Sequence, residues 1–285
     1  MLAYQHAYHA GNIADVHKHL TLFALSRQMT AKTSSITFVD THAGRGLYPL
    51  DATETQRGGE YRDGVLPLWQ ARDRLQDDDL LDDWLAALDL LNPRTKLECY
   101  PGSPWWFAQM MREGDRLELY ELHPREYAHL DDLSVAAGGL PVAARRHFAD
   151  GLEAVVKHLP VPTPRLCVLI DPSYEVKRDY LTVAETLGKI GAKARHAVVA
   201  IWYPLLPEER HLELLEASRA TGLRKLLRSE LRYRDPGKGR GMYGSGMLLF
   251  NPPWRLDDEL RQSFDHLAAF YGGGASHHLD WWVEE

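Results

Sequence analysis

Apolar and polar residues follow two different periods along the chain, and these periods predict helices separated by strands. Apolar side chains recur every three or four positions over residues 12–30, which is the spacing of one helix face. Short apolar runs at residues 35–40, 116–122, 165–170 and 196–204 are typical of buried strands. Strands that alternate with helices favour an α/β fold with a mostly parallel sheet.

The remaining segments complete this prediction. Further helices are expected at residues 103–113, 180–193 and 208–220, with a short one from Pro124, and a weak strand is expected to end near Asp150. Ser103 is the expected N-cap of the first of these helices, because its hydroxyl can accept a hydrogen bond from a first-turn amide. Residues 223–234 and 245–250 predict two strands joined by a glycine-rich turn, and this closing pair is expected to contribute an antiparallel strand.

One segment interrupts the alternation of strands and helices. Residues from about 58 to 92 have helical spacing and are acidic, and Pro93 helps to end them. We interpret residues 51–94 as a small helical insertion subdomain. The flanking residues 1–50 and 95–285 would then form one α/β core with a mostly parallel sheet.

Composition narrows the class of protein. With 285 residues and 45% hydrophobic content, the chain can form one large α/β domain with an insertion, or two small domains. It contains no apolar run long enough to span a bilayer, and its start lacks the pattern of a secretory signal. Its two cysteines, Cys99 and Cys167, are far apart, which fits a reducing, cytoplasmic location and disfavours a disulfide framework or a thiolate zinc site.

The charge distribution argues both for and against binding to nucleic acid. The formal net charge of −7 argues weakly against a phosphate-rich partner, and residues 77–83 hold an acidic cluster. Residues 224–240, by contrast, contain seven basic side chains: Arg224, Lys225, Arg228, Arg232, Arg234, Lys238 and Arg240. This stretch is either a contact for RNA or an ordinary solvated face, and the sequence leaves both interpretations open.

Polar residues follow several of the predicted strands in positions suited to a nucleotide-like ligand. The first strand runs into residues 40–46, Asp-Thr-His-Ala-Gly-Arg-Gly, where Gly44 lets the backbone approach a ligand closely. Glu121 ends the next strand, where a carboxylate can accept both ribose hydroxyls of an adenosine. Asp150 and Gly151 follow the weak strand, and Asp150 could accept from an adenine amine or simply cap a helix.

The most specific motif is Asp171-Pro172-Ser173-Tyr174, directly after the apolar strand at residues 165–170. The lone pair of an aromatic amine is delocalised into its ring, so methylation of that amine is difficult. A carboxylate from Asp171 and the carbonyl of Pro172 could accept the two amine hydrogens and steer the lone pair toward a methyl donor. The ring of Tyr174 could stack on a base that has left its helix.

The amino-terminal segment is rich in histidine, at positions 6, 9, 17 and 19. A metal site is disfavoured, because His17 and His19 face different sides of a helix and no zinc-binding pattern accompanies them. Tyr4 and Lys18 in the same segment could reach RNA phosphate or the mouth of the active site.

Taken together, seven motifs closely resemble the bacterial RlmJ family. They span nearly the whole chain in order, so as a set they are far more specific than any one of them. They are residues 4–19, Asp40-Thr41-His42-Ala43-Gly44, Tyr100-Pro101-Gly102-Ser103-Pro104, Glu121-Leu122-His123-Pro124, Leu169-Ile170-Asp171-Pro172, Trp202-Tyr203-Pro204 and Asn251-Pro252-Pro253-Trp254.

The resemblance implies a methyltransferase that transfers one methyl group from S-adenosyl-L-methionine to the N6 amine of an adenine in 23S ribosomal RNA. It implies a Rossmann-like core with a small helical subdomain, and Asp171 as the catalytic acceptor. It places Tyr4, His6 and Lys18 on the RNA side of the site. The cofactor contacts that it implies are His19, His42, Ser103, Glu121, Asp150 and Gly151, beside Gly44 and Asp171.

The chain departs from the family pattern at one place. The family has Asp-Pro-Pro-Tyr, and Ser173 stands where the second proline is expected. Serine leaves the Pro172 carbonyl and both flanking side chains in place but frees one turn dihedral, so the expected consequence is a slower reaction of the same kind.

Two classes of alternative function stay open at this point. One is methylation of adenine in DNA or of a glutamine amide in protein, although glutamine enzymes usually resemble Asn-Pro-Pro-Tyr and Asp171 argues against them. The other is a nucleic-acid-binding protein that kept the fold and lost catalysis. We further expect a monomer that needs no metal and acts on free 23S RNA or an early assembly intermediate.

Overall fold

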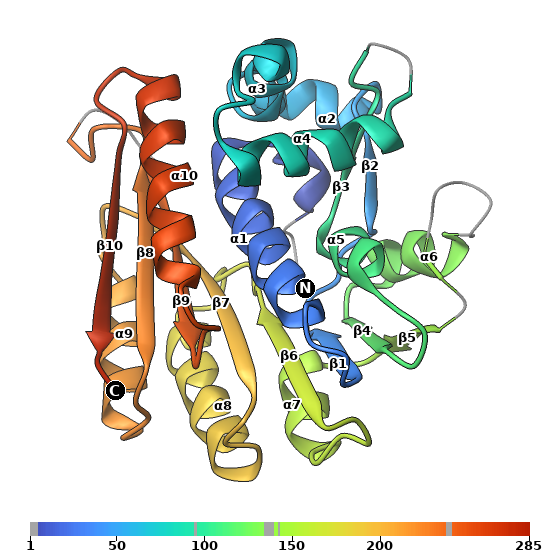
Figure 1. The fold of residues 1–285 in the computed structure, drawn as a ribbon, viewed down its shortest axis with the longest axis vertical. Coiled ribbons are helices and arrows are strands. Elements are labelled where there is room, and N and C mark those ends of the chain that lie inside the picture. The colour runs from blue at the N-terminus through green and yellow to red at the C-terminus, as the bar shows by residue number, and fades with distance from the viewer. Residues whose placement is uncertain (1–4, 94–95, 134–139, 142, 238–240) are drawn as a thin grey trace.

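The computed structural model describes residues 5–93, 96–133, 140–141, 143–237 and 241–285 (Figure 1). An eight-stranded sheet runs through these residues in the order β10-β8-β9-β7-β6-β1-β4-β5. Its strands are β1 (Ile36–Asp40), β4 (Arg116–Glu121), β5 (Ala144–Phe148), β6 (Arg165–Ile170), β7 (Val198–Leu205), β8 (Leu226–Arg232), β9 (Gly244–Phe250) and β10 (Ser276–Val283).

The sheet has a parallel part and an antiparallel part. Strands β7, β6, β1, β4 and β5 are parallel to one another, whereas β9 is antiparallel to both β7 and β8, and β10 is antiparallel to β8. The predicted α/β class with a mostly parallel sheet and an antiparallel carboxyl-terminal part is confirmed. Because five parallel strands end at one edge, the residues that follow them are brought together there.

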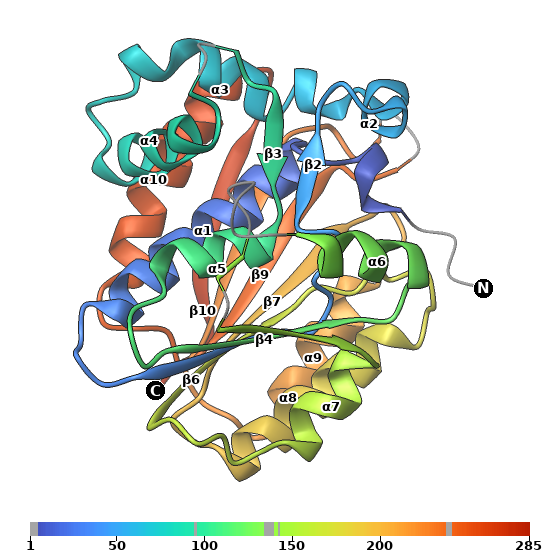
Figure 2. The same cartoon turned by 90° about the vertical axis from the view of Figure 1, so that its right-hand side faces the viewer.

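Helices cover both faces of the sheet (Figure 2). On one face lie α1 (Ile13–Thr30), α5 (Ser103–Met110) and α10 (Leu256–Tyr271), and on the other lie α7 (Gly151–Lys157), α8 (Asp179–Lys193) and α9 (His211–Ala220). The short helix α6 (Pro124–Asp132) packs beside β4 and β5. Each face has its own apolar core, so the sheet is buried on both sides.

The segment between β1 and α5 forms a small helical layer above this core. A two-stranded ribbon, β2 (Leu47–Pro49) and β3 (Cys99–Pro101), carries it. Its helices are α2 (Thr53–Gly58), α3 (Val65–Ala71) and α4 (Asp79–Leu91), with 3-10 turns at Glu60–Arg62 and Arg72–Arg74. The predicted helical region is therefore broken into short pieces, because glycines such as Gly59, with φ of 67°, end a helix rather than continue it.

One expectation for this architecture is wrong, and one region of it was not predicted. The N-cap of α5 is Gly102, and Ser103 is already helical and makes no capping hydrogen bond. The carboxyl terminus contains α10 and β10, and β10 forms the outer edge of the sheet beside β8. The apolar positions Leu256, Leu260 and Phe264, which are fully buried in α10, were the sequence signal for this helix.

Helix α1 is unusual because it is buried on nearly all sides. It lies between the sheet, α5, α10 and α4. Polar side chains are buried in it together with the apolar ones: Asp15, His17, Lys18, His19 and Thr21. A buried polar group needs a partner, so these side chains must be satisfied by neighbouring elements.

Replacement of Trp84 by alanine tests how the helical layer is attached. Its ring stacks on Trp106 of α5 with centroids 5.3 Å apart, and both side chains are fully buried. We expect Trp84→Ala to lower the free energy of unfolding by about 3–5 kcal/mol, because it leaves a large cavity. Chemical denaturation measures this loss. Leu90→Ala in the same helix is the control, since Leu90 is 78% exposed. An equal loss of stability in both variants would show that the contact between Trp84 and Trp106 does not attach the helical layer.

Candidate active site

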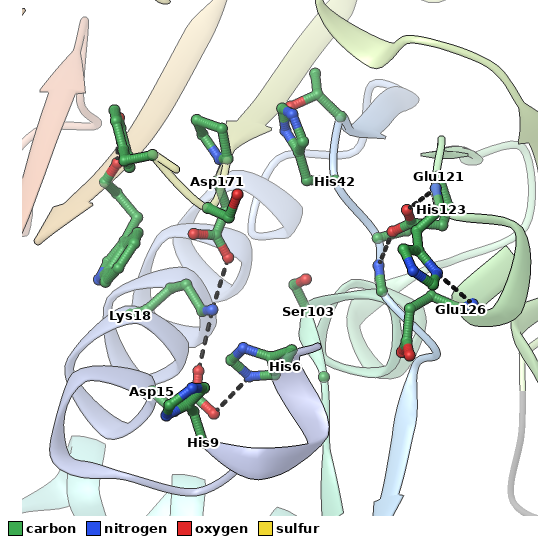
Figure 3. Close-up of a pocket in the computed structure, with 18 of the residues that line it drawn as sticks. His6, His9, Asp15, Lys18, His42, Ser103, Glu121, His123, Glu126 and Asp171 are labelled. Atoms are coloured by element: carbon green, nitrogen blue, oxygen red, sulfur yellow. Dashed lines mark hydrogen bonds and ion pairs between the residues drawn. The ribbon is translucent and has the colours of Figure 1, made fainter. Parts of the chain in front are cut away.

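A cavity of about 410 Å³ opens at the carboxyl edge of the parallel strands (Figure 3). This volume is within the range of sites that hold a cofactor or substrate. It is lined by every predicted site residue that lies within the described residues: His6, Lys18, His19, His42, Gly44, Ser103, Glu121, Asp150, Gly151, Asp171, Pro172 and Tyr174. The remaining predicted residue, Tyr4, lies outside them.

At one end of the cavity, the turn after β1 is joined to the carboxylate that ends β4. The amide of Gly44, which has φ of 60°, donates to Glu121 Oε2 at 2.8 Å, and the amide of His123 donates to Oε1 at 2.6 Å. Burial raises the pKa of Glu121, although these two amides oppose the shift. The two amides fix the plane of the carboxylate at the cavity wall.

Asp150 has a structural role as well as a place in the cavity. It is the N-cap of α7, and its Oδ1 accepts from the amides of Leu152 at 2.9 Å and Glu153 at 3.1 Å. Gly151 packs directly on the backbone of Thr41, where an added Cβ would collide with the Thr41 carbonyl. The capping interpretation is therefore correct, and it leaves the Asp150 side chain at the wall of the site.

Two histidines of the cavity are held in the neutral form. Burial lowers the pKa of His42 to about 4, and its Nδ1 lies 2.8 Å from the Thr41 hydroxyl. Burial also holds the pKa of His19 well below its usual value. His19 Nδ1 lies 2.8 Å from the Tyr100 hydroxyl, whereas its buried Nε2 has no hydrogen-bond partner among the described residues. This ring nitrogen is suited to a polar atom of a bound ligand.

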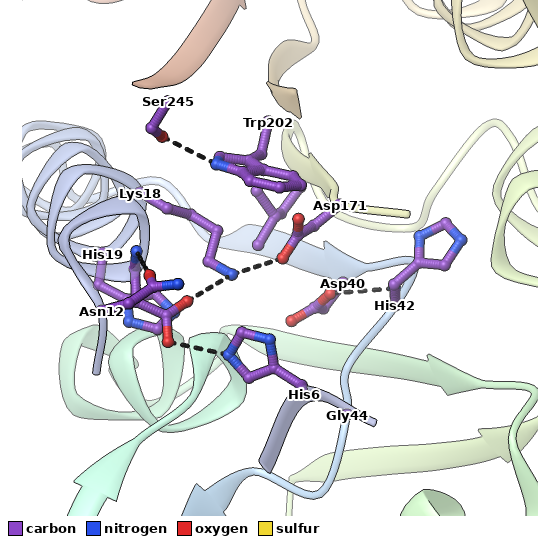
Figure 4. A network of polar contacts seen from close by, with 12 residues as sticks. His6, Asn12, Lys18, His19, Asp40, His42, Gly44, Asp171, Trp202 and Ser245 are labelled. Carbon is purple, nitrogen blue, oxygen red and sulfur yellow. Dashed lines mark hydrogen bonds and ion pairs between the residues drawn. The ribbon is translucent and has the colours of Figure 1, made fainter. Parts of the chain in front are cut away.

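At the other end of the cavity, Asp171 follows β6 and meets helix α1 (Figure 4). Lys18 Nζ lies 2.6 Å from Asp171 Oδ2 and 3.0 Å from Asp15 Oδ1, so one ammonium joins two carboxylates. Burial raises the pKa of Asp171, and Lys18 opposes this shift. Lys18 therefore lies in the cavity as a partner of the predicted acceptor.

Asp15 was not among the predicted site residues, and it organises this end of the cavity. In addition to its ion pair with Lys18, the Asp15 carboxylate accepts a hydrogen bond from the Gly11 amide at 2.9 Å. His6 Nε2 lies 2.9 Å from Asp15 Oδ2. Although burial acts in the opposite direction, His6 and Lys18 hold the pKa of Asp15 well below its usual range. Its place in the quoted motif at residues 4–19 was the only sequence signal for it.

A second acid, Asp40, is the last residue of β1 and directly precedes the turn. It was also not predicted as a site residue. It is fully buried, and burial raises its pKa to about 7, with the nearby Asp171 acting in the same direction. Its Oδ1 accepts from the His42 amide at 3.2 Å. A carboxyl group beside a second carboxylate in a buried site is favoured in its protonated form.

Tyr174 is packed more deeply than its predicted stacking role suggested. It is 7% exposed, its ring stacks on Tyr180 at 4.4 Å between centroids, and its hydroxyl donates to the Trp202 carbonyl at 2.7 Å. Its φ of 54° is unfavourable for a residue with a side chain and marks a sharp turn at the end of the motif. Tyr174 is thus anchored by ring packing and a hydrogen bond directly after Ser173, the residue that replaces the family proline.

Trp202 forms the wall beside Asp171 and was missed as a site residue. It lies on β7, lines the cavity, and places its ring 5.7 Å from Lys18 Nζ. The strand end Trp202-Tyr203-Pro204 was a sequence signal, but an aromatic residue in a strand is more often part of a core. Only the direction of the side chain in the folded sheet identifies its place.

Two arginines of the basic stretch at residues 224–240 are paired with acids of the same sheet. Arg228 Nε lies 2.8 Å from Asp280 Oδ1, and Arg232 lies 3.1 Å from Glu230 Oε2. Lys238 and Arg240 lie outside the described residues. The charges of Arg228 and Arg232 are thus balanced within the protein.

Two further findings concern the chain as far as it is described. None of its helices is both long and apolar enough to cross a membrane. No group of three or more histidine, cysteine or acidic side chains is arranged there to hold a metal ion, and Cys99 and Cys167 are free thiols.

A Rossmann-like sheet with a glycine turn, an acid on the next strand and an Asp-Pro motif after a third strand defines a class, the S-adenosylmethionine-dependent methyltransferases. The particular family follows from the whole sequence. Residues 33–283 match the family model for "Ribosomal RNA large subunit methyltransferase D, RlmJ", and the chain belongs to this family.

Relatives agree with this assignment over nearly the full length. The chain is 33% identical to ribosomal RNA large subunit methyltransferase J of Escherichia coli K12, over 99% of each chain. It is 35% identical to the protein of the same name from Haemophilus influenzae, over 94% of this chain and 93% of that one. The crystal structure of protein LPL1258 from Legionella pneumophila is 32% identical and superposes with a TM-score of 0.86, covering 96% and 98% of the two chains.

The contact between Gly151 and Thr41 gives a direct test of the site's framework. We expect Gly151→Ala to push α7 away from the turn after β1 and to weaken binding of S-adenosylmethionine at least tenfold, because the new Cβ collides with the Thr41 carbonyl. Isothermal titration measures the affinity. Gly237→Ala in an exposed loop is the control, and an unchanged affinity in Gly151→Ala would show that this contact does not shape the site.

Proposed function

We propose that this protein transfers a methyl group from S-adenosyl-L-methionine to the N6 amine of one adenine in 23S ribosomal RNA. The observation that carries the proposal is the position of Asp171. Its carboxylate lies at the end of β6 inside the cavity, next to Pro172, and the acids Glu121 and Asp150 lie on other walls of the same cavity. One cavity thus offers a cofactor end and an acceptor end.

The cofactor end fits an adenosine that carries an amino-acid tail. The Glu121 carboxylate, fixed by two amides, can accept ribose hydroxyls with its remaining lone pairs. The Asp150 side chain can accept from the adenine amine, and the unpartnered Nε2 of His19 can bind a polar atom of the tail. When bound, S-adenosylmethionine supplies the methyl group as a sulfonium.

The acceptor end fits an exocyclic amine. The Asp171 carboxylate and the Pro172 carbonyl would accept its two hydrogens, which turns the nitrogen lone pair toward the cofactor. Lys18 holds Asp171 Oδ2 and opposes the rise in the pKa of Asp171 that burial causes, which leaves the other oxygen, Oδ1, for the amine. The methylated amine loses one proton, and Asp171 is placed to take it.

The aromatic side chains at this end would hold the target base. A base must leave its stack to reach a buried carboxylate, and aromatic rings can hold it there. Trp202 and Tyr174 contact each other, with ring centroids 6.1 Å apart, and both line the cavity beside Asp171. We assign Tyr4, His6 and Lys18 to the RNA side of the site, in agreement with the resemblance of the amino-terminal segment.

The choice of 23S RNA as substrate rests on the two named relatives, since both are ribosomal RNA large subunit methyltransferases. We further propose that the substrate is free RNA or an early assembly intermediate, and that the protein acts as a cytoplasmic monomer without a metal.

Transfer of labelled methyl to deproteinised 23S RNA from cells lacking the gene tests this proposal. We expect the label in N6-methyladenosine. Label in duplex DNA instead of RNA would overturn the choice of substrate. Cofactor binding without transfer to either nucleic acid would indicate a chain that has lost catalysis.

Substitution of Asp171 tests the assigned acceptor. We expect Asp171→Asn and Asp171→Ala to lower kcat at least about a hundredfold, because the amine loses its charged acceptor, with cofactor affinity largely kept. Single-turnover methyl transfer and cofactor titration separate the two effects. Asp258→Ala on the exposed side of α10 is the control. Normal turnover of the Asp171 variants would rule out this role.

Removal of the Lys18 charge should change the pH dependence. Burial raises the pKa of Asp171 and Lys18 opposes it, so the pKa should rise further in Lys18→Met. Because the ionised carboxylate is the acceptor, the acid limb of the rate profile should move to higher pH, with the rate lost first at low pH. A pH profile of kcat measures the shift. An acid limb in the same place would show that Lys18 does not control ionisation.

A further inference from the structure

A chain of buried polar side chains leads from the wall of the cavity to the surface of the protein. Trp202 Nε1 donates to the Ser245 hydroxyl at 2.9 Å, which lies 3.0 Å from His17 Nδ1. His17 Nε2 lies 3.0 Å from the Ser229 hydroxyl. The proposed methyl transfer uses neither serine.

The series of hydrogen-bonded side chains continues to the protein surface. The Ser229 hydroxyl lies 2.9 Å from His277 Nε2, and His277 Nδ1 lies 3.4 Å from Asp265, whose side chain is 62% exposed. His17, Ser229 and Ser245 are themselves completely buried. The chain therefore crosses the apolar layer between the sheet, α1 and α10.

The two ends of this chain fix the direction of every hydrogen in it. At the inner end, the indole nitrogen of Trp202 can only donate. Ser245 therefore accepts from Trp202 and gives its own hydrogen to His17 Nδ1, which leaves the hydrogen of His17 on Nε2. At the outer end, the carboxylate of Asp265 can only accept, so His277 carries its hydrogen on Nδ1. Ser229 then donates to His277 and accepts from His17.

Both ends thus predict the same pattern independently. The opposite tautomer of His17 would give the Ser245 oxygen two donors and leave its hydroxyl hydrogen without an acceptor among the described residues. An unsatisfied buried hydrogen of this kind is disfavoured. Burial also lowers the pKa of His17 well below its usual value and that of His277 to about 4, so both rings are neutral, as the pattern requires.

The inner end of the chain fixes a side chain that touches the acceptor site. The Trp202 ring lies 5.7 Å from Lys18 Nζ (Figure 4). The backbone carbonyl of Trp202 accepts from the Tyr174 hydroxyl at 2.7 Å. Lys18 in turn holds Asp171. A rotation of the indole would remove one face of the cavity and the ring beside the Lys18 ammonium.

We propose that Ser245 and His17 are positioning residues, which hold the Trp202 indole in one orientation against Lys18 through a one-way hydrogen-bond chain. This inference rests on the proposed methyl transfer for its consequence, since Trp202 is assigned to the wall that receives the base. The hydrogen-bond chain itself depends only on the distances between its side chains and not on the proposed reaction.

A matched pair of variants separates positioning from simple stability. Ser245 and Ser229 are both completely buried and both bonded to His17, but only Ser245 contacts Trp202. We expect Ser245→Ala and Ser229→Ala to lose similar stability. Only Ser245→Ala should lower kcat for methyl transfer, roughly tenfold, the size expected for one lost orienting hydrogen bond, with KM for the cofactor unchanged. Equal changes in kcat in both variants, or none in either, would overturn the positioning role.

Nuclear magnetic resonance of the full-length protein tests the chain without reference to activity. With isotope-labelled histidine, we expect the hydrogen on Nε2 of His17 and on Nδ1 of His277, assigned by comparison with His17→Gln and His277→Gln. The Trp202 indole hydrogen should be protected from exchange in the wild type and in Ser229→Ala, and should lose protection in Ser245→Ala. A hydrogen on His17 Nδ1, or protection retained in Ser245→Ala, would contradict the chain.

These readouts distinguish the two proposals. A wild-type protein that transfers no methyl group to RNA would defeat the proposed function, whereas the tautomers and the indole protection would still decide whether Ser245 holds Trp202.

Discussion

A single buried ammonium group holds the candidate site together. Lys18 is 5% exposed and lies within 3.0 Å of both Asp15 and Asp171. Removing a charge from water costs several kcal/mol unless it is paired with good geometry. The two carboxylates satisfy this need, and in return the ammonium fixes the amino-terminal helix against the end of β6. Loss of Lys18 would leave two buried carboxylates without the cation that they share.

This requirement explains why α1 is so rich in buried polar groups. The helix has polar side chains facing two ways: Asp15, Lys18 and His19 toward the cavity, and His17 toward the antiparallel strands. Lys18, His19 and His17 bond to elements far away in the sequence, whereas Asp15 bonds within the amino-terminal segment. These directed hydrogen bonds and ion pairs fix the rotation of α1 about its axis and its position along that axis. Apolar packing alone tolerates small shifts. A methyl-transfer site needs this precision, because small displacements of the reacting groups cost large factors in rate.

The sequence predicted a large part of the fold for identifiable reasons. Five strands with continuous apolar runs or a following acid were recognised, because parallel strands buried on both faces leave that pattern. The carboxyl-terminal helix α10 was missed although Leu256, Leu260 and Phe264 have helical spacing. Ser103 was expected to cap α5, yet its side chain faces the cavity and Gly102 caps the helix. Capping depends on one or two dihedral angles, which residue type alone does not fix.

The sequence by itself determined that three acidic side chains share the site. Glu121, Asp150 and Asp171 each follow a strand, and parallel strands bring their carboxyl ends to one edge whatever the details of packing. Only the tertiary structure decided what those side chains touch. Lys18 and Asp171 are 153 residues apart in the chain, and Trp202 and Ser245 are 43 apart, so no local spacing relates them. Partner choice of this kind arises because burial forces each polar group to find a neighbour in space, and sequence order does not encode that neighbour.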